Sequence, residues 1–173
     1  MRKSKFAPVI VLTLICVVVA LALAIANAFT APVIERAQAE KTAKILREVY
    51  PTQGVFEPID PETADGSLPE SVIEIYKAPD GGYVFKVKVK AFKPDFIVLV
   101  GINPDGAVTD TKYLQSSETL SAEDKLDGAY KGVSADGFKA EIIGGATYTS
   151  KGYAQAVEDS LTAFTVMKGG DGK

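Results

Sequence analysis

The feature that most constrains this chain is an uncharged stretch, residues 6–34, which follows the basic residues Arg2, Lys3 and Lys5. Its most apolar part, residues 9–26, is long enough to cross a bilayer as a helix when its flanks are included. Basic flanking residues favour the cytoplasmic side, so we predict a single-pass protein of the cell membrane with a cytoplasmic N-terminus. Residues 1–30 then form the N-terminus and the transmembrane helix, and the rest of the chain is extracytoplasmic.

A cleaved signal peptide is the alternative interpretation of the same stretch. Ala26, Asn27 and Ala28 fit a small-x-small cleavage site. The apolar region is longer than the roughly 7 to 15 residues that are typical of signal peptides. This length favours a retained anchor.

The composition narrows the chemistry that this chain can perform. It has no histidine, and its single cysteine, Cys16, lies in the apolar stretch. The usual general base and the commonest zinc ligand are therefore missing, and no intrachain disulfide can form. We expect no catalytic acid, base or nucleophile and no metal site, so redox chemistry would need a cofactor. The net charge of -3 and the scattered lysines give no reason to expect nucleic acid.

Residues 31–51 have the spacing of an amphipathic helix that ends at Tyr50 and Pro51. Pro32 is expected in the first turn of a new or continuing helix. We interpret this segment as a stalk helix that rises from the membrane and docks on the domain. Residues 52–69 are rich in Pro, Gly, Asp and Glu, which predicts a loop.

Alternation of apolar and polar residues predicts strands in the next part of the chain. A short strand is expected at 72–76, and the tract 83–90 places Lys86, Lys88 and Lys90 on a face that we interpret as solvated. The nearly continuous apolar run 96–102 predicts a strand covered on both faces. Residues 103–106 predict a tight turn, and 107–113 return as the partner strand.

Two helices are expected after the strands. Ser121 is positioned to cap a short helix, and a longer amphipathic helix is expected over about 151–167, capped by Thr149 or Ser150. Residues 169–173 predict a disordered tail. The predicted fold class is α+β, with an antiparallel sheet and flanking helices in a domain over residues 52–168.

The segment that carries chemistry is 141–150, with the sequence EIIGGATYTS. Gly144, Gly145 and Ala146 are small, so another group can approach the backbone closely. The N-terminus of the following helix offers unpaired N–H groups and the positive end of a dipole, which suits a phosphate. From these residues alone, a plain glycine-rich turn with a Thr or Ser cap remains the alternative.

The same segment resembles the flavinylation motif Asp-x-x-Ser/Thr-Gly-Ala-Thr of the FMN-binding domain in the Rnf G and Nqr C subunits. Gly145, Ala146 and Thr147 match the motif, whereas Glu141 replaces the Asp and Gly144 replaces the Ser/Thr. The N-terminal span, the stalk and the strand before Asp105-Gly106 are also similar to the Rnf G subunit, and the short length favours it over the Nqr C subunit.

This resemblance implies that a flavin transferase moves FMN from FAD onto Thr147, where it stays bound as a phosphoester. Tyr148 is expected either to pack on the flavin ring or to fill core, and Thr149 and Ser150 to cap the helix or to donate to the phosphate. The family usually carries Glu-Thr-Pro-Gly-Leu-Gly, of which Glu118 and Thr119 are present here. By family position these two residues border the flavin; alternatively they form an exposed loop pair.

The function implied by the resemblance is electron transfer within a membrane complex that couples ferredoxin and NAD to ion pumping. The chain would act there as a redox subunit, with the other membrane and redox subunits of an Rnf-type complex as its partners. Two alternatives stay open: a stand-alone flavinylated extracytoplasmic carrier for another reductase, and a non-redox anchored binding or assembly domain.

Overall fold

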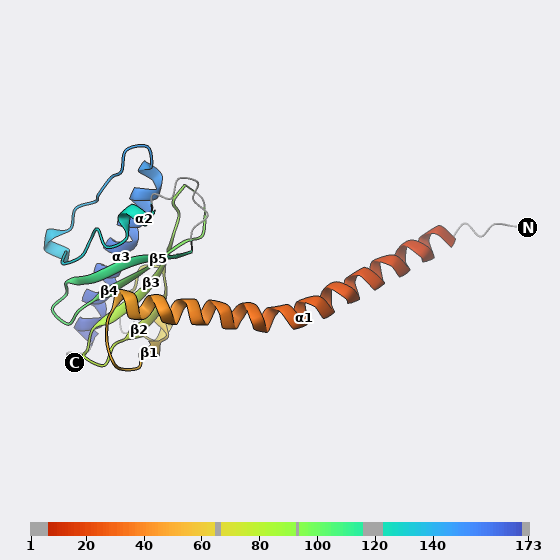
Figure 1. The fold of residues 1–173 in the computed structure, drawn as a ribbon, viewed down its shortest axis with the longest axis horizontal. Coiled ribbons are helices and arrows are strands. Elements are labelled where there is room, and N and C mark those ends of the chain that lie inside the picture. The colour runs from red at the N-terminus through yellow and green to blue at the C-terminus, as the bar shows by residue number, and fades with distance from the viewer. Residues whose placement is uncertain (1–6, 65–66, 93, 116–122, 171–173) are drawn as a thin grey trace, which may run out of the picture. The chain divides into compact units, whose positions relative to one another are not determined.

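The computed structural model describes residues 7–64, 67–92, 94–115 and 123–170 (Figure 1). The chain divides into two compact units, Met1–Lys41 and Thr42–Lys173. The first unit holds most of helix α1 (Ala7–Val49), and the second holds the end of α1, a five-stranded sheet and the helices α2 (Glu123–Leu126) and α3 (Thr147–Gly170). The predicted α+β class, with an apolar N-terminal helix and an antiparallel sheet flanked by helices, is confirmed.

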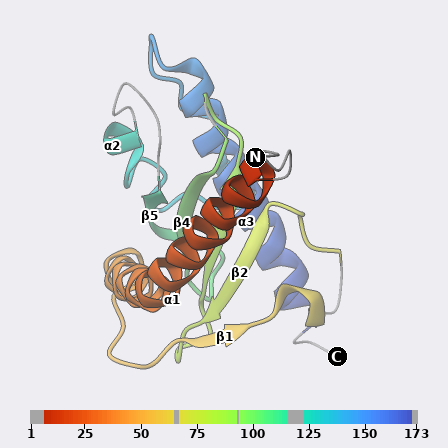
Figure 2. The same cartoon turned by 90° about the vertical axis from the view of Figure 1, so that its right-hand side faces the viewer.

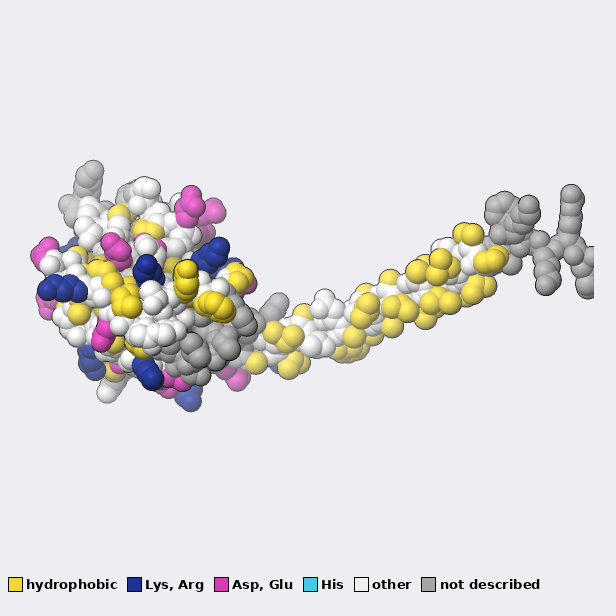
Figure 3. Space-filling view, turned by 90° about the horizontal axis from the view of Figure 1, so that it is seen from above, with side chains coloured by type: hydrophobic (Ala, Val, Ile, Leu, Met, Phe, Trp, Pro, Cys, Tyr) yellow, Lys and Arg dark blue, Asp and Glu magenta, His cyan; other side chains and the backbone are white. Residues whose placement is uncertain are grey.

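In the first unit, α1 presents apolar side chains in every direction, because the consecutive residues 9–12 are all exposed. Yellow hydrophobic side chains cover the visible face of this helix in Figure 3. Of the helices that the structure describes, α1 is long and apolar enough to cross a membrane. Pro32 lies inside α1, so the predicted stalk continues the apolar helix without a break. The basic residues Arg2, Lys3 and Lys5 lie outside the described part of the chain.

The sheet is a simple antiparallel meander in the order β1-β2-β3-β4-β5. Its strands are β1 (Glu57–Ile59), β2 (Val72–Lys77), β3 (Tyr83–Val89), β4 (Phe96–Ile102) and β5 (Val108–Gln115). The four predicted strand tracts are therefore found, and β4 is covered on both faces as expected. The three-residue strand β1 lies in the segment that we predicted as loop, because three residues are too few for a periodic signal.

One face of the sheet packs against α3 and forms the main core (Figure 2). The alternation of β3 supplies Phe85 and Val87, which are fully buried, and α3 supplies Val157, Leu161 and Phe164. Burying these large side chains is the principal favourable term for the domain. This packing fixes α3, and therefore its N-terminus, relative to the strands.

The other face of the sheet is covered by the last turns of α1. These turns belong to the predicted stalk, the segment that we expected to dock on the domain. Leu46, Val49 and Tyr50 are buried there against Val84 and Leu99. The compact second unit begins at Thr42, inside the predicted stalk, and so includes the end of α1.

The prediction that the lysines of β3 form a solvated face is wrong in part. Lys86 is 15% exposed and pairs with Glu74 at 2.6 Å, and its neighbour on the same face, Val84, is fully buried. Lys88 and Lys90 are exposed, and Lys88 pairs with Asp95 at 2.5 Å. The helix that covers this face comes from a distant part of the sequence, which strand periodicity does not reveal.

The long connection from α2 to α3 runs along the free edge of β5. The backbone of Val108 donates to Val133 at 2.8 Å and accepts from Gly132 at 2.7 Å, and Gly128 donates to the carbonyl of Thr111 at 3.0 Å. These hydrogen bonds pair backbone groups at the edge of β5. The connection then continues to the start of α3 (Figure 1). The segment of interest, 141–147, is the last part of this connection.

The final helix is longer than predicted. It begins at Thr147 and ends at Gly170, whereas we expected about 151–167 and a disordered tail from 169. Glycine has a low helix propensity, so the glycines near the C-terminus led us to predict an earlier helix end than the structure shows. Residues 171–173, like the predicted cap Ser121, lie outside the described residues.

Candidate functional site at the start of helix α3

The segment 141–147 ends at the N-terminus of α3 and contains a turn at Gly144 and Gly145. Gly145 has φ +84°, a left-handed conformation that favours glycine. A Cβ built on either glycine would find no heavy atom of the described residues within 4 Å. The space beside this turn is therefore open, as the approach of a bulky group to the backbone requires.

Thr147 is the first residue of α3 and its side chain is exposed. The first intrahelical hydrogen bond at this end runs from Ser150 N to Ala146 O at 2.9 Å. The amide groups of Thr147 and Tyr148 precede this bond, where a helix has no intrahelical acceptor for them. The hydroxyl of Thr147 therefore lies at the positive end of the helix dipole, where a phosphate is stabilised.

The two other hydroxyls of the segment are buried. Thr149 is 4% exposed and Ser150 is fully buried. Our expectation that one of them caps α3 is wrong, because the helix already begins at Thr147 and both residues lie inside its first turn. Ser150 Oγ donates to the carbonyl of Ala146 at 3.0 Å and accepts from the amide of Ile143 at 3.0 Å.

Tyr148 is 70% exposed and Ile142 is 47% exposed. Of the two expectations for Tyr148, core filling is wrong because the side chain faces solvent. Its contact with a flavin ring stays a prediction. Ala146, the small residue before Thr147, is buried at 8% exposure, so it anchors the segment and does not provide open space.

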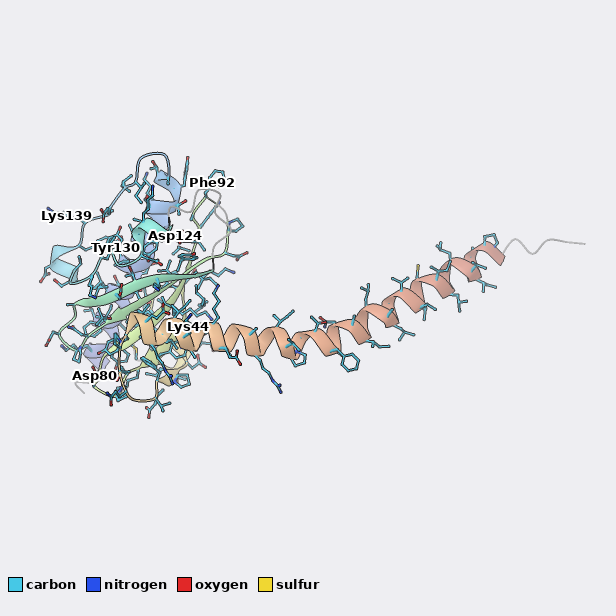
Figure 4. The ribbon with its side chains drawn as sticks, in the orientation of Figure 1. Lys44, Asp80, Phe92, Asp124, Tyr130 and Lys139 are labelled. Atoms are coloured by element: carbon cyan, nitrogen blue, oxygen red, sulfur yellow. The ribbon has the colours of Figure 1, made fainter. Side chains whose placement is uncertain are left out.

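The upstream end of the segment is held by Tyr130, on the loop between α2 and α3 (Figure 4). Its hydroxyl accepts a hydrogen bond from the amide of Glu141 at 2.9 Å. Its ring stacks against Phe138 at 5.7 Å and against Tyr153 of α3 at 6.0 Å between centroids. Burial raises the pKa of Tyr130 above its ordinary value. The sequence did not identify Tyr130, because no local pattern connects it to Glu141.

A half-buried carboxylate lies beneath this region. Asp127 accepts hydrogen bonds from the Tyr153 hydroxyl at 2.8 Å and from the Tyr113 amide at 3.1 Å. Burial raises the pKa of Asp127 although these bonds and Lys112 act to lower it. The burial of Tyr153 raises its pKa as well. Asp127, which directly follows α2, is thus bonded both to Tyr113 of β5 and to Tyr153 of α3.

The connection between β3 and β4 packs against the second turn of α3. A Cβ on Gly152 would meet Ala91 Cβ at 2.9 Å and the carbonyl of Lys90 at 3.2 Å. Phe92, which follows Ala91, is 62% exposed, and Figure 4 shows it near the start of α3. Phe92 and Gly152 were missed from the sequence, although a glycine inside a helical pattern is a signal of close approach.

Two predicted site residues, Glu118 and Thr119, lie outside the described residues, in the connection from β5 to α2. Over the described ranges there is no group of three or more Cys, Asp or Glu side chains that could hold a metal ion. The described features that fit a phosphate-bearing cofactor are the exposed hydroxyl of Thr147, the open glycine turn and the helix N-terminus.

Comparison with known proteins agrees with this chemistry. The family model described as an FMN-binding domain matches residues 92–162, which run from the β3–β4 connection into α3 and include Thr147. The chain is 27% identical, over 191 aligned positions, to the G subunit of the Na(+)-translocating ferredoxin:NAD(+) oxidoreductase complex of Acetobacterium woodii. The alignment covers 94% of this chain and 92% of that protein. The chain is therefore similar to an FMN-binding domain over residues 92–162 and, along nearly its whole length, to this G subunit.

Proposed function

We propose that this chain is the flavin-bearing electron-transfer subunit of a membrane-bound, ion-translocating ferredoxin:NAD oxidoreductase. FMN is bound covalently, by a phosphoester to Thr147 Oγ. The matched FMN-binding domain supports the cofactor, and the similarity across nearly the whole chain to a subunit of such a complex supports the assembly.

The observation that carries the attachment site is the difference in exposure among three hydroxyls. Thr147 is exposed at the first position of α3, whereas Thr149 is 4% exposed and Ser150 is fully buried. A transferase can reach the first without unfolding the helix. The hydroxyl of Ser150 is also bonded to two backbone groups, and breaking both bonds would oppose its modification.

The attachment reaction balances without any oxidation or reduction. The phosphoanhydride bond of FAD breaks, a new bond forms between the FMN phosphorus and Thr147 Oγ, and AMP leaves. The hydroxyl proton of Thr147 passes to a base of the flavin transferase or to water. This domain contributes only the acceptor oxygen and its presentation.

When bound, FMN supplies the electron chemistry that the side chains of this protein lack. The residues of this chain bind the cofactor and orient it. The first-turn amides of α3 would donate to a phosphate on Thr147, and the exposed Tyr148 is the next residue after the attachment point. The packing of α3 on the sheet fixes this end of the helix to the domain core.

We also propose that α1 anchors the domain to the cell membrane, with the N-terminus in the cytoplasm and the domain outside. The apolar length of α1 and the basic residues Arg2, Lys3 and Lys5 support this orientation. A reporter that is active only outside the cytoplasm, fused after Pro51, should be active. Activity of a cytoplasm-only reporter at the same point would contradict the orientation, and a mature chain lacking residues 1–28 would indicate a cleaved signal peptide.

The attachment site is tested by in-gel flavin fluorescence of the full chain produced with a flavin transferase. The denatured wild-type band should fluoresce, because a noncovalent flavin is lost on unfolding. Thr147→Ala should remove the fluorescence, and Thr147→Ser should keep part of it because the hydroxyl remains. Thr162→Ala is the matched control, since Thr162 is an exposed threonine of the same helix. Fluorescence that survives in Thr147→Ala would disprove the assignment.

A further inference from the structure

Ser150 connects the two ends of the glycine turn through a single side-chain oxygen. Its Oγ accepts from Ile143 N and donates to Ala146 O, each at 3.0 Å. A third bond, from Ala146 N to Ile143 O at 3.1 Å, closes the turn between the same two residues. We call these three bonds the clasp.

Among the described residues, few contacts other than these three hydrogen bonds restrain the turn at Gly144 and Gly145. Gly144 and Gly145 have no side chains and both are exposed. In the part of the chain that the structure describes, no heavy atom lies within 4 Å of the position that a Cβ would occupy on either. Glycine also has the largest conformational freedom to lose on ordering. The conformation of this turn therefore depends on the hydrogen bonds at its ends.

A second serine of α3 shows which part of this arrangement is special. Ser160 is also fully buried, and its Oγ donates to the carbonyl of Ala156, four residues earlier, at 2.7 Å. Ser150 makes the equivalent bond to Ala146. The additional bond of Ser150 is the one that it accepts from Ile143, across the turn.

We propose that Ser150 is a positioning residue for the attached flavin, which rests on the function proposed above. By holding Ile143 to the first turn of α3, its hydroxyl fixes the turn that leads into Thr147. The clasp thereby limits the local motion of the group bound to Thr147. Functional groups have to be held within about 0.5 Å of their working geometry, which needs supporting bonds of this kind.

The experiment compares Ser150→Ala with Ser160→Ala in the flavinylated full chain. Both changes remove a buried hydroxyl and one bond to the preceding helical turn, so both should lower stability. The first readout is amide hydrogen exchange at Ile143, which should become about fivefold faster in Ser150→Ala, the effect of losing one ordinary hydrogen bond. In Ser160→Ala it should stay at the wild-type rate.

The second readout is the time-resolved fluorescence anisotropy of the flavin. Ser150→Ala should add a fast depolarising component from local flavin motion, and Ser160→Ala should not. Ser150→Cys, which keeps the side-chain size but bonds weakly, should lie between wild type and Ser150→Ala, and it replaces Ser150→Ala if that variant does not fold. Equal anisotropy in the Ser150 and Ser160 variants would overturn the proposal, whatever the exchange rate of Ile143.

The two proposals fail in distinguishable ways. A denatured wild-type band without fluorescence, or a fluorescent Thr147→Ala band, overturns the attachment site. Ile143 exchange can still be measured in the flavin-free chain, where an unchanged rate in Ser150→Ala shows that the clasp does not hold the turn and overturns the positioning role.

Discussion

The hydroxyl of Tyr130 accepts a hydrogen bond from the amide of Glu141 at 2.9 Å, although the two residues belong to different parts of the connection between α2 and α3. Tyr130 is 2% exposed, and its ring stacks on Tyr153 of α3. A residue of the hydrophobic core thus holds the beginning of the segment that ends at Thr147.

Tyr130→Phe should keep the stacked ring and remove this acceptor. The free energy of unfolding should fall by about 1 kcal/mol, the ordinary net worth of a hydrogen bond, because water can reach the exposed Glu141. Urea unfolding measures the loss. Amide exchange should increase at Glu141 and not in the strands. An unchanged exchange rate at Glu141 would show that the bond does not restrain the segment.

Gly152→Ala should destabilise the domain, although alanine is the better helix former by about 1 kcal/mol. The added methyl would lie 2.9 Å from Ala91 Cβ, and such overpacking typically costs about 1 to 3 kcal/mol. Gly169→Ala is the matched control, because Gly169 lies in the same helix and no heavy atom of the described residues is within 4 Å of its Cβ position. Thermal unfolding should show a lower Tm for the first variant and an equal or higher Tm for the second. A stabilised Gly152→Ala would contradict the close approach of the β3–β4 connection.

Asp127→Asn should change how stability depends on pH. The pKa of Asp127 is raised by burial, so the folded state holds the proton more tightly than the unfolded state does. Its contribution to stability is therefore greatest below the ordinary Asp pKa and is lost as the pH rises through the folded pKa. Asparagine keeps an oxygen acceptor for Tyr153 and Tyr113 without the charge.

The stability of Asp127→Asn relative to wild type should consequently increase from about pH 3 to about pH 7. Urea unfolding across this range gives the difference directly. Asp136→Asn, at an exposed position, is the control and should show no such trend. A difference between Asp127→Asn and wild type that is the same at every pH would refute the buried-carboxylate interpretation.

Much of the fold could be predicted because its signals are local. The alternation in 83–89, the continuous apolar run of β4 and the turn at Gly106, which has φ +85°, each follow from a few neighbouring residues. The resemblance of 141–147 to a known motif likewise depends on adjacent positions. The similarity to an FMN-binding domain and the α+β class were therefore accessible from the sequence.

The features that the sequence missed depend on contacts between distant segments. The end of α1 covers Val84 and Leu99, so a face that strand periodicity assigned to solvent is partly buried. Ser150 looked like a helix cap because serine is favoured at the position just before a helix. Its contact with Ile143 depends on where α3 begins, and that start was placed about one turn too late.

The most direct test of the central claim is the mass spectrum of the tryptic peptide spanning residues 140–151, from protein produced with a flavin transferase and FAD. Cleavage after Lys139 and Lys151 releases Thr147, Tyr148, Thr149 and Ser150 together. The peptide should be heavier by the mass of FMN less one water, and fragmentation should place the added mass on Thr147. An unmodified peptide, or fragments that place the flavin on Thr149 or Ser150, would contradict the account.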